Sequence, residues 1–307
     1  MFKNIDPLVY SGQYVSHMHS FFGSDAVNVN TSTSTELREG RSTAENPNDF
    51  SVYWVPTLYF VNKTAPANQT HQPIIPMRFS AYYELLNEAE IPIPEDFQVV
   101  VGNASASSPE HLTEDNGISW ACEGDDAEEG KEPAAFPTRT CSTHLQTLLF
   151  FPDCANPETF ETAYSKNPDW YEEYGENRCP EGMYRIPRLR FSIRYDLRNI
   201  LQDGWEGEPP LELACGNSYC SHGDFINGCL TEAAKYMLED PSKSEYFQVN
   251  GPLGTGDEGT ACDRTAKDSD PGHGADDYSE SLKMMEKKVD AKTRHKRHHH
   301  NAAHRRV

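Results

Sequence analysis

Short runs of β-branched and aromatic residues, separated by Pro, Gly and Asn, dominate the hydrophobic pattern of the chain. The run at 189–197 alternates apolar Leu, Phe, Ile and Tyr with polar Arg, Ser and Asp, which is the period-two pattern of a half-buried strand. The runs at 51–62, 97–103 and 145–151 have a similar composition and also predict strands. Within 51–62, Pro56 requires a bulge or an edge position, because proline cannot donate to a β-ladder.

Helical patterns are few. The segment 79–90 is one candidate, and 225–240 is the other, supported by an apolar stripe that runs from Leu230 to Met237. The 21 Pro and 20 Gly are scattered along the chain and leave little room for long helices. The sequence therefore predicts a mainly β fold: a single disulfide-bonded, β-sandwich-like domain with a few short helices.

The composition divides the 307 residues into two parts. Residues 1–250 contain the predicted elements and enough aromatic anchors for one core, in which Trp54 and Trp120 are expected because apolar residues flank them. Residues 251–307 form a low-complexity segment, acidic first and then basic and histidine-rich, for which we expect disorder. No apolar run approaches the roughly 18 residues of a membrane-spanning helix.

Charge is unevenly distributed along the chain. Residues 1–282 hold 18 Lys and Arg against 46 Asp and Glu, a net charge of −28, whereas the last 25 residues carry +7. Such an acidic body would repel nucleic acid, so we expect no nucleic-acid partner. The basic tail has three readings: an anchor to an anionic polymer, a weak metal-binding histidine tract, or a solvated end.

The eight cysteines all lie between Cys122 and Cys262, and none has the C-x-x-C spacing of a zinc ribbon or redox site. Neighbours in sequence suggest the disulfides Cys122–Cys141 and Cys154–Cys179, with Cys215–Cys220 and Cys229–Cys262 as further guesses. Glycosylation sequons begin at Asn30, Asn62, Asn68 and Asn103. Together these features favour an extracellular, oxidising compartment. The N-terminus shows no signal peptide, so either the protein is intracellular with reduced thiols or a leader is missing, and we expect the second.

His17 and His19 are the first candidates for chemistry. In a strand, residues i and i+2 project to one face, so an H-x-H pair can bind one metal ion. A catalytic zinc site needs a third protein ligand, for which His222 is the best candidate, with Asp224 two positions away as fourth ligand or general base. The competing interpretation is that these histidines cap loops and bind backbone groups. The cofactor prediction is accordingly a divalent metal such as zinc, or none.

The opening segment "NIDPLVYSGQYVSHMHSFFGSDAV" (4–27) and seven later motifs resemble those of DUF1996, a family of mostly fungal secreted proteins. The opening segment matches the family's Asp-Pro and His-x-His region, and seven further motifs follow in the family's order. They are "YWVPTLYF" (53–60), "YYELL" (82–86), "VVVGN" (99–103), "ISWAC" (118–122), "FFPDC" (150–154), "CPEGMYRIPRL" (179–189) and "HGDFING" (222–228). The resemblance implies a secreted, disulfide-bonded, β-rich domain, sometimes found beside carbohydrate-binding modules, but no established reaction.

Carried over by position, the resemblance implies a shared polar pocket of His17, His19, His222, Asp224 and Asn227. The chain departs from the family after "FFPDC", where an expected histidine-rich segment is absent, and at Met183 and Tyr184, which replace a His-Pro pair. Loss of these histidines favours a binding or structural role, or a chemistry that needs only the retained set.

Three functions remain open. The chain is predicted to be a secreted cell-wall or matrix glycoprotein that binds polysaccharide, and Trp170, Tyr171 and Tyr174 could form an exposed carbohydrate platform. The alternatives are a metal-assisted glycan-modifying enzyme using His17, His19 and His222, and a purely structural surface protein. Catalysis requires the three histidines to converge, and imidazoles separated by more than about 8 Å could not share one ion.

Overall fold

The apolar run at 51–62 forms the centre of the fold, as two strands rather than one. In the computed structural model, which describes residues 1–66, 70–166, 176–240 and 249–255, strand β3 is Val52–Pro56 and β4 is Leu58–Val61. Every residue of β3 is buried, and β3 pairs with strands on both sides. Pro56 therefore does not lie on an edge: it ends β3, and the chain continues into a different sheet.

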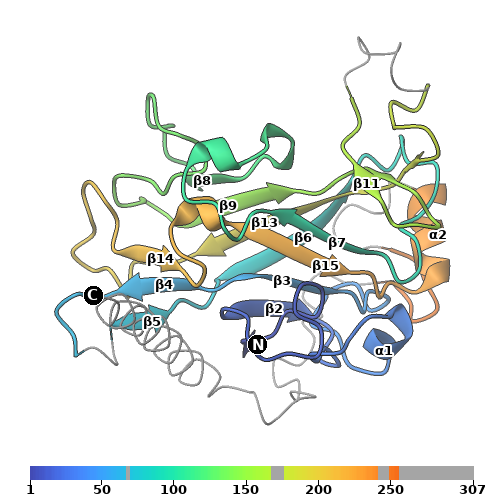
Figure 1. Cartoon of the computed structure of the whole chain (residues 1–307), viewed down its shortest axis with the longest axis horizontal. Coiled ribbons are helices and arrows are strands. Elements are labelled where there is room, and N and C mark those ends of the chain that lie inside the picture. The colour runs from blue at the N-terminus through green and yellow to red at the C-terminus, as the bar shows by residue number, and fades with distance from the viewer. Residues whose placement is uncertain (67–69, 167–175, 241–248, 256–307) are drawn as a thin grey trace, which may run out of the picture.

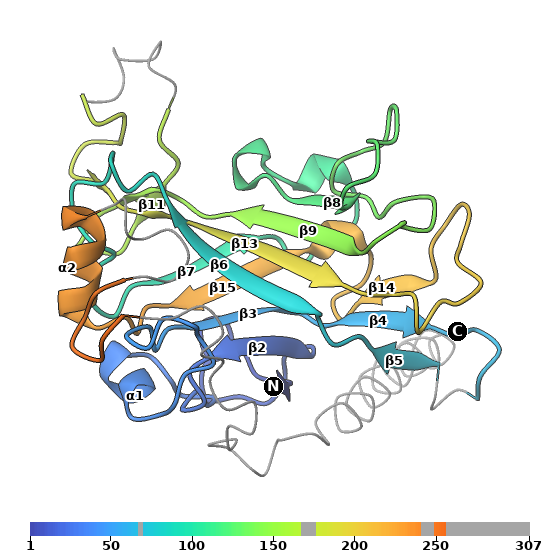
Figure 2. The same ribbon diagram turned by 180° about the vertical axis from the view of Figure 1, so that it is seen from behind.

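Two antiparallel sheets make up the sandwich, with β15 and β3 crossing behind β6 and β13 in Figure 2. The five-stranded sheet has the order β1 (Phe2–Lys3), β2 (His19–Gly23), β3, β15 (His222–Ile226) and β7 (Gln98–Gly102). The four-stranded sheet has the order β6 (Arg78–Glu84), β13 (Arg188–Tyr195), β9 (Leu145–Phe150) and β8 (Ser119–Cys122). The predicted β-sandwich-like class and the strands at 97–103, 145–151 and 189–197 are confirmed.

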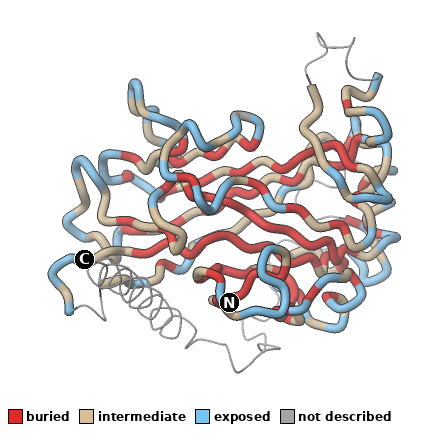
Figure 3. Tube along the Cα trace, in the orientation of Figure 1, coloured by how far each residue is buried: buried red, intermediate tan, exposed pale blue. Residues whose placement is uncertain are grey.

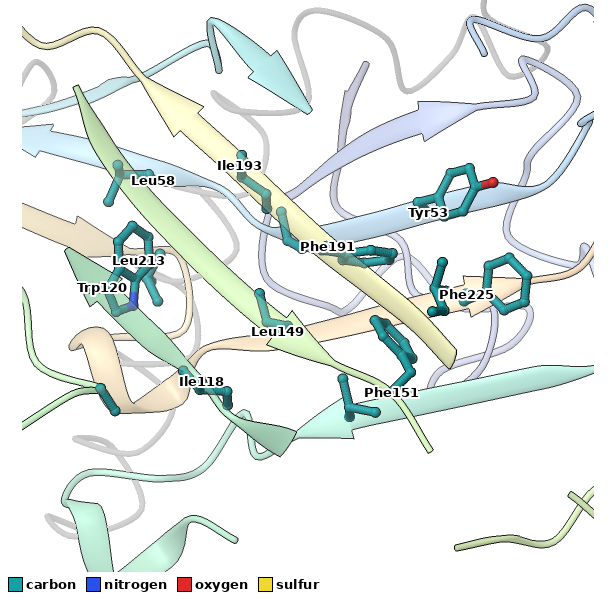
Figure 4. Close-up of a cluster of buried hydrophobic side chains, with 14 of the residues drawn as sticks. Tyr53, Leu58, Ile118, Trp120, Leu149, Phe151, Phe191, Ile193, Leu213 and Phe225 are labelled. Atoms are coloured by element: carbon teal, nitrogen blue, oxygen red, sulfur yellow. The ribbon is translucent and has the colours of Figure 1, made fainter. Parts of the chain in front are cut away.

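The main core fills the space between these sheets (Figure 4). Phe191 from the four-stranded sheet contacts the ring of Tyr53 from the five-stranded sheet at 5.8 Å between centroids, and Phe225 lies beside Tyr53. Trp120 is 2% exposed in this core, as its apolar neighbours predicted. Burial follows the strands, and exposed positions concentrate in the connecting loops (Figure 3).

The outer face of the five-stranded sheet is covered as well. Phe21, Trp54 and Ile226 point to this side and pack against Ile5 and Leu37, which come from the N-terminal segment and from helix α1 (Ser34–Arg38). In Figure 1 this segment and α1 lie below β2 and β3. The five-stranded sheet is therefore a middle layer, which explains why its central strand β3 is a continuous apolar run rather than an alternating one.

Smaller elements complete the fold. Two three-stranded sheets have the orders β11 (Thr162–Ala163), β10 (Cys154–Ala155), β12 (Tyr184–Arg185), and β14 (Leu211–Leu213), β4, β5 (His71–Pro73). Short 3-10 turns lie at Pro109–His111, Glu114–Asn116 and Ser218–Cys220. Disulfides join Cys122 to Cys141, Cys154 to Cys179 and Cys215 to Cys220, which confirms three predicted pairings.

Two helix predictions need correction. The segment 79–90 is not a helix, because Arg78–Glu84 forms β6 and pairs with β13 along seven positions. Its aromatic residues follow a period of two, with Phe79 and Tyr83 packed on the core and Tyr82 exposed. The helix predicted at 225–240 begins only at Thr231: α2 is Thr231–Glu239, and the preceding residues belong to β15.

The remaining domain predictions fall largely on residues that the structure does not describe. The predicted tail at 251–307 overlaps the described residues only at 251–255. Cys229 is buried and forms no disulfide with another described cysteine, while its predicted partner Cys262 lies outside the described residues, so this pairing stays a prediction. Among the described residues, no helix has the length and apolar composition needed to cross a membrane.

Candidate metal centre

Three histidines from distant parts of the sequence meet on the covered face of the five-stranded sheet. His19 is the first residue of β2, His222 is the first residue of β15, and His17 lies in the loop that leads into β2. Strand β3 lies between β2 and β15, and its Pro56 pairs with His19, so the two imidazoles meet across this strand. The sheet order therefore creates the cluster, because His17 and His19 precede His222 by about 200 residues of chain.

The nitrogens that face one another are all Nε2 atoms. His222 Nε2 lies 3.2 Å from Nε2 of His17 and 3.2 Å from Nε2 of His19. The ring centroids of the three imidazoles are 4.1 to 5.4 Å apart, which is well inside the limit of about 8 Å set for a shared ion. His19 and His222 are fully buried, whereas His17 is half-buried and forms the side of the cluster nearest to solvent.

Backbone carbonyls fix the tautomers of the two buried rings. His19 Nδ1 donates to the Ile5 carbonyl at 2.9 Å, and His222 Nδ1 donates to the Cys220 carbonyl at 2.8 Å. A carbonyl oxygen only accepts, so each Nδ1 carries the hydrogen, and each neutral ring presents a bare lone pair at Nε2. Two lone pairs then face each other at 3.2 Å with no hydrogen between them.

Burial also keeps these rings neutral. Desolvation lowers the pKa of His222 to about 4, opposed only by its hydrogen bond to the Cys220 carbonyl. Desolvation lowers the pKa of His19 well below its usual value, and the neighbouring His17 and His222 lower it further. Neutral imidazole is the form that binds metals, so both buried rings are in the ligand form at neutral pH.

Asp224 adds a carboxylate on the same face. Its Oδ2 atom lies 4.0 Å from His222 Nε2, the residue is fully buried, and neither carboxylate oxygen has a hydrogen-bond partner among the described residues. Desolvation raises the pKa of Asp224 well above its usual value, and the nearby charge of Asp6 raises it further. A buried carboxyl without a partner is costly, and a cation at this position would satisfy it.

The spacing of His222 Nε2 from each of the other two histidine nitrogens fits two ligands of one small cation. Zn–N bonds of about 2.0–2.1 Å in a tetrahedral site place two ligand nitrogens about 3.3–3.4 Å apart, close to the 3.2 Å that separates His222 Nε2 from Nε2 of His17 and from Nε2 of His19. The ligand atoms of His19, His222 and Asp224 lie within 4.8 Å of one another. Cys215 is equally close to His17 and His222, but its sulfur is bonded to Cys220 and supplies no thiolate.

The groups behind the ligands resemble those of a metal site. Metal-binding histidines usually donate their second ring nitrogen to a carbonyl or carboxylate, which fixes the ring orientation. The Cys215–Cys220 disulfide closes the short loop that contains the Cys220 carbonyl, so this cross-link holds the acceptor of His222 in place. Ile5, the acceptor for His19, is fully buried and belongs to the segment that covers the sheet.

The other predicted site residues lie elsewhere. Asn227 is at the opposite end of β15, about 16 Å along the strand from His222, and its amide nitrogen donates to the carbonyls of Ile93 and Pro94. It therefore does not belong to the histidine pocket, contrary to the position-based expectation, and it holds a loop instead. The predicted platform of Trp170, Tyr171 and Tyr174 lies outside the described residues.

Three of the four sequons are described. Asn30 and Asn103 are exposed and Asn62 is half-buried, whereas Asn68 lies outside the described residues. Glycosylation at all four positions stays a prediction.

Sequence reasoning missed the role of the N-terminal segment in the site. Asp6 is buried, and its Oδ1 atom accepts hydrogen bonds from the backbone nitrogens of Leu8 and Val9. Desolvation raises its pKa, and its charge acts on Asp224. The Asp-Pro pair in the opening motif was the available signal, but a turn aspartate and a site aspartate look alike in sequence.

The chain is thus a disulfide-bonded antiparallel β-sandwich with a histidine cluster built on the first residues of two strands. A sequence profile of the family described as domain of unknown function DUF1996 matches residues 6–229, which is most of the chain and includes the whole cluster. The protein belongs to the DUF1996 family. No curated protein and no solved structure matches the chain.

Proposed function

We propose that this protein is an extracellular metalloenzyme that holds a divalent ion such as zinc with His17, His19 and His222 and hydrolyses bonds in glycans. The observation that carries the proposal is that His222 Nε2 lies 3.2 Å from Nε2 of both His17 and His19, and that His19 and His222 are lone-pair donors by tautomer. Three disulfides support the extracellular assignment, because such bonds persist in oxidising compartments.

The residues of the cluster have distinct roles in this proposal. His19 and His222 form the rigid part of the ligand set, because their Nδ1 hydrogens are fixed by carbonyls. His17 completes the set from the solvent side, and Asp224 serves as fourth ligand or as general base. A divalent ion held by three imidazoles can polarise a carbonyl group or acidify a water molecule.

The glycan part of the proposal comes from the family resemblance, since secreted members sometimes carry carbohydrate-binding modules. Polysaccharide binding without catalysis is the second candidate, favoured by an arginine-rich sheet face on the other side of the molecule, which is described below. A purely structural role would leave the lone pairs of His19 and His222 opposed without compensation, so the geometry favours it least.

The metal content of the protein with its disulfides formed tests the proposal. The histidine-rich tail must first lose its own metal-binding side chains, because a histidine tract can bind metal by itself. The parent should be the full-length chain in which five tail histidines are replaced by Gln: His295, His298, His299, His300 and His304. We expect this parent to retain one zinc ion per chain after dialysis. His19→Ala should lose it, whereas His111→Ala, which changes an exposed histidine remote in sequence from the cluster, should not.

Cobalt substitution gives a second readout, since a four-coordinate cobalt site absorbs strongly in the visible range and an exposed histidine tract does not. Glycan hydrolysis by the loaded parent, measured as released reducing ends or acetate, then tests the enzyme assignment. A parent that binds no metal, or that binds it equally well after His19→Ala, would contradict the proposed metal centre. A metal-loaded parent that does not hydrolyse glycans would support the metal centre and contradict the enzyme assignment.

A further inference from the structure

The outer face of the four-stranded sheet carries an ordered set of arginines, which we call the arginine face: Arg78, Arg188, Arg190 and Arg194. The strand register places Arg190 between Tyr82 of β6 and Phe150 of β9, and Arg194 beside Arg78. Strands β6 and β13 lie in front of the five-stranded sheet in Figure 2, so this face is on the opposite side of the sandwich from the histidine cluster.

The guanidinium groups of Arg188 and Arg190 are held in fixed orientations by aromatic rings and by the carboxylate of Glu84. The Arg190 guanidinium lies 4.3 Å above the Tyr82 ring, and that of Arg188 lies 5.0 Å from the Phe150 ring. Glu84 accepts from Arg190 Nε at 2.5 Å and from Arg188 Nη2 at 2.9 Å. Because these contacts already order the side chains, less entropy is lost when a ligand binds.

Several donors on this face remain available. Among the described residues, neither Nη atom of Arg190 nor Nη1 of Arg188 makes a hydrogen bond, and Arg78 and Tyr82 are exposed. Within the described part of the chain, Glu84 and Glu123 are the only carboxylates that form ion pairs with the four arginines. The face is therefore locally cationic on a body whose net charge is −28 over residues 1–282, and at physiological salt, charges more than about 8 Å away are largely screened.

We propose that the arginine face binds an acidic polysaccharide, a polymer with a carboxylate on each sugar unit. Every cation of the face is an arginine, whose planar fork matches a carboxylate in two parallel hydrogen bonds, whereas lysine provides only a point charge. Arg188, Arg190 and Arg194 follow one another on β13 at about 7 and 13 Å. Such a row fits repeated carboxylates better than one isolated anion, and the Tyr82 ring offers an apolar surface to a sugar.

A cavity continues this face at the end of β9. It has a volume of about 250 Å³ and is lined by Trp205, His144 and Arg198, among others. His144 lines the cavity and also contacts Glu123, which pairs with Arg194, so the cavity and the arginine face are contiguous. A cavity of this size beside an indole ring is a suitable place for one sugar unit of the polymer.

Binding to polygalacturonate tests the proposal, with neutral dextran as the control polymer. The basic tail could bind polyanions by itself, so the parent is the full-length chain in which the nine Lys and Arg of residues 283–307 are replaced by Gln. We expect the parent to bind polygalacturonate and not dextran. Replacement of Arg188, Arg190 and Arg194 by Gln should weaken binding at least tenfold.

Arg41→Gln is the matched control, because Arg41 is also an exposed, ion-paired arginine but belongs to the opposite side of the sandwich, near α1. Since the triple variant leaves Glu84 and Glu123 without partners and could unfold, Arg78→Gln and Tyr82→Ala provide a second set at exposed positions. We expect each to weaken binding severalfold with an unchanged melting temperature.

Three results would overturn the assignment. The first is equal binding by the parent and by the folded arginine variants. The second is equal loss with Arg41→Gln, which would show a response to net charge alone. The third is competition by single-stranded RNA at equal charge concentration, which would show that the face does not distinguish sugar carboxylates from phosphates. Zinc content should be unchanged in every arginine variant, so this test and that of the metal centre can fail separately.

Discussion

The two outer faces of the sandwich hold nitrogen-bearing side chains in opposite environments. On the five-stranded sheet, the N-terminal segment covers His19 and His222, and burial keeps both rings neutral and fixes their tautomers. On the four-stranded sheet, Arg188 and Arg190 stay partly exposed, at 31% and 20% of their side-chain surface. The covering layer, rather than the strands themselves, therefore decides whether a face can coordinate a cation or attract an anion.

Replacement of one histidine of the cluster should give the largest difference between the two faces, because it should weaken zinc binding and leave polygalacturonate binding intact. We expect His222→Ala to weaken zinc binding about 1,000-fold, beyond the 10–100-fold that loss of a hydrogen-bond partner behind a ligand causes. Polygalacturonate binding should stay unchanged, because the arginine face is on the other sheet. Competition with a chromophoric chelator measures the first quantity. A parallel loss of both activities would indicate a shared folding defect rather than two sites.

Acid should destabilise the metal-free protein through its buried histidines. The folded-state pKa of His222 is about 4, below the unfolded value of 6.5, so the unfolded chain binds the proton more readily between these values. Above about pH 6.5, His222 should therefore leave the free energy of unfolding unchanged. Between pH 6.5 and pH 4, protonation of His222 in the unfolded chain should lower the free energy of unfolding by on the order of 3 kcal/mol. Asp224 has the opposite effect, because its pKa is raised in the folded protein: its contribution to the free energy of unfolding falls as the pH rises above its unfolded pKa of 3.8.

Urea unfolding in the presence of a chelator isolates this contribution. It compares the parent that has Gln at the five tail histidines with the same chain carrying His222→Gln. The difference in stability between the two proteins should shrink as the pH falls from 7 to 4. A constant difference across this range would contradict the buried, neutral state of His222.

The Cys215–Cys220 disulfide should tune the metal centre without forming part of it. Replacing both cysteines by Ser frees the loop whose carbonyl orients His222, and we expect zinc affinity to fall about 10- to 100-fold. The Cys122–Cys141 disulfide, which lies at the end of the four-stranded sheet, provides the control, because its removal should lower stability but not zinc affinity. Equal effects of the two removals on affinity would show that the loop does not position the ligand.

The smallest expected effect is on the geometry of the arginine face. Arg190→Lys keeps the charge but loses the flat contact with Tyr82 and the paired donors. We expect polygalacturonate binding to weaken about two- to fivefold, the equivalent of a cation–π contact of about 0.5–1 kcal/mol. Binding curves at two salt concentrations should show an unchanged salt slope, since the charge is retained. A change in slope would instead indicate a different number of charge contacts.

The strands were the most predictable part of the fold, for reasons visible in particular residues. The run at 189–197 alternates strictly, so its period identified a strand with one buried face. The segment 79–90 was assigned wrongly because Tyr82, Tyr83 and Glu84 fit either period, and only pairing with β13 selected the strand. Three cysteine pairings followed from sequence proximity, whereas the pairing of Cys229 with Cys262 stays a prediction because Cys262 lies outside the described residues.

The candidate site was only partly readable from the chain. His17, His19 and His222 were identifiable as residue types capable of binding metal, and the structure brings their rings together. Asn227 was grouped with them through its motif, although five residues of extended strand carry it away from the cluster. The contribution of Asp6 depends on its burial beside Asp224, which no local pattern reveals.

The β-rich class, three cross-links and the identity of the histidines follow from the amino-acid sequence, because period, composition and chain proximity are local properties. Strand order, which depends on the folded chain, places β3 between β2 and β15, so that the rings of His19 and His222, 203 residues apart in sequence, face each other at Nε2. The tertiary structure also decides which sheet face is covered. Strand order and burial are set by packing of the whole chain, and the chemistry of both faces depends on them.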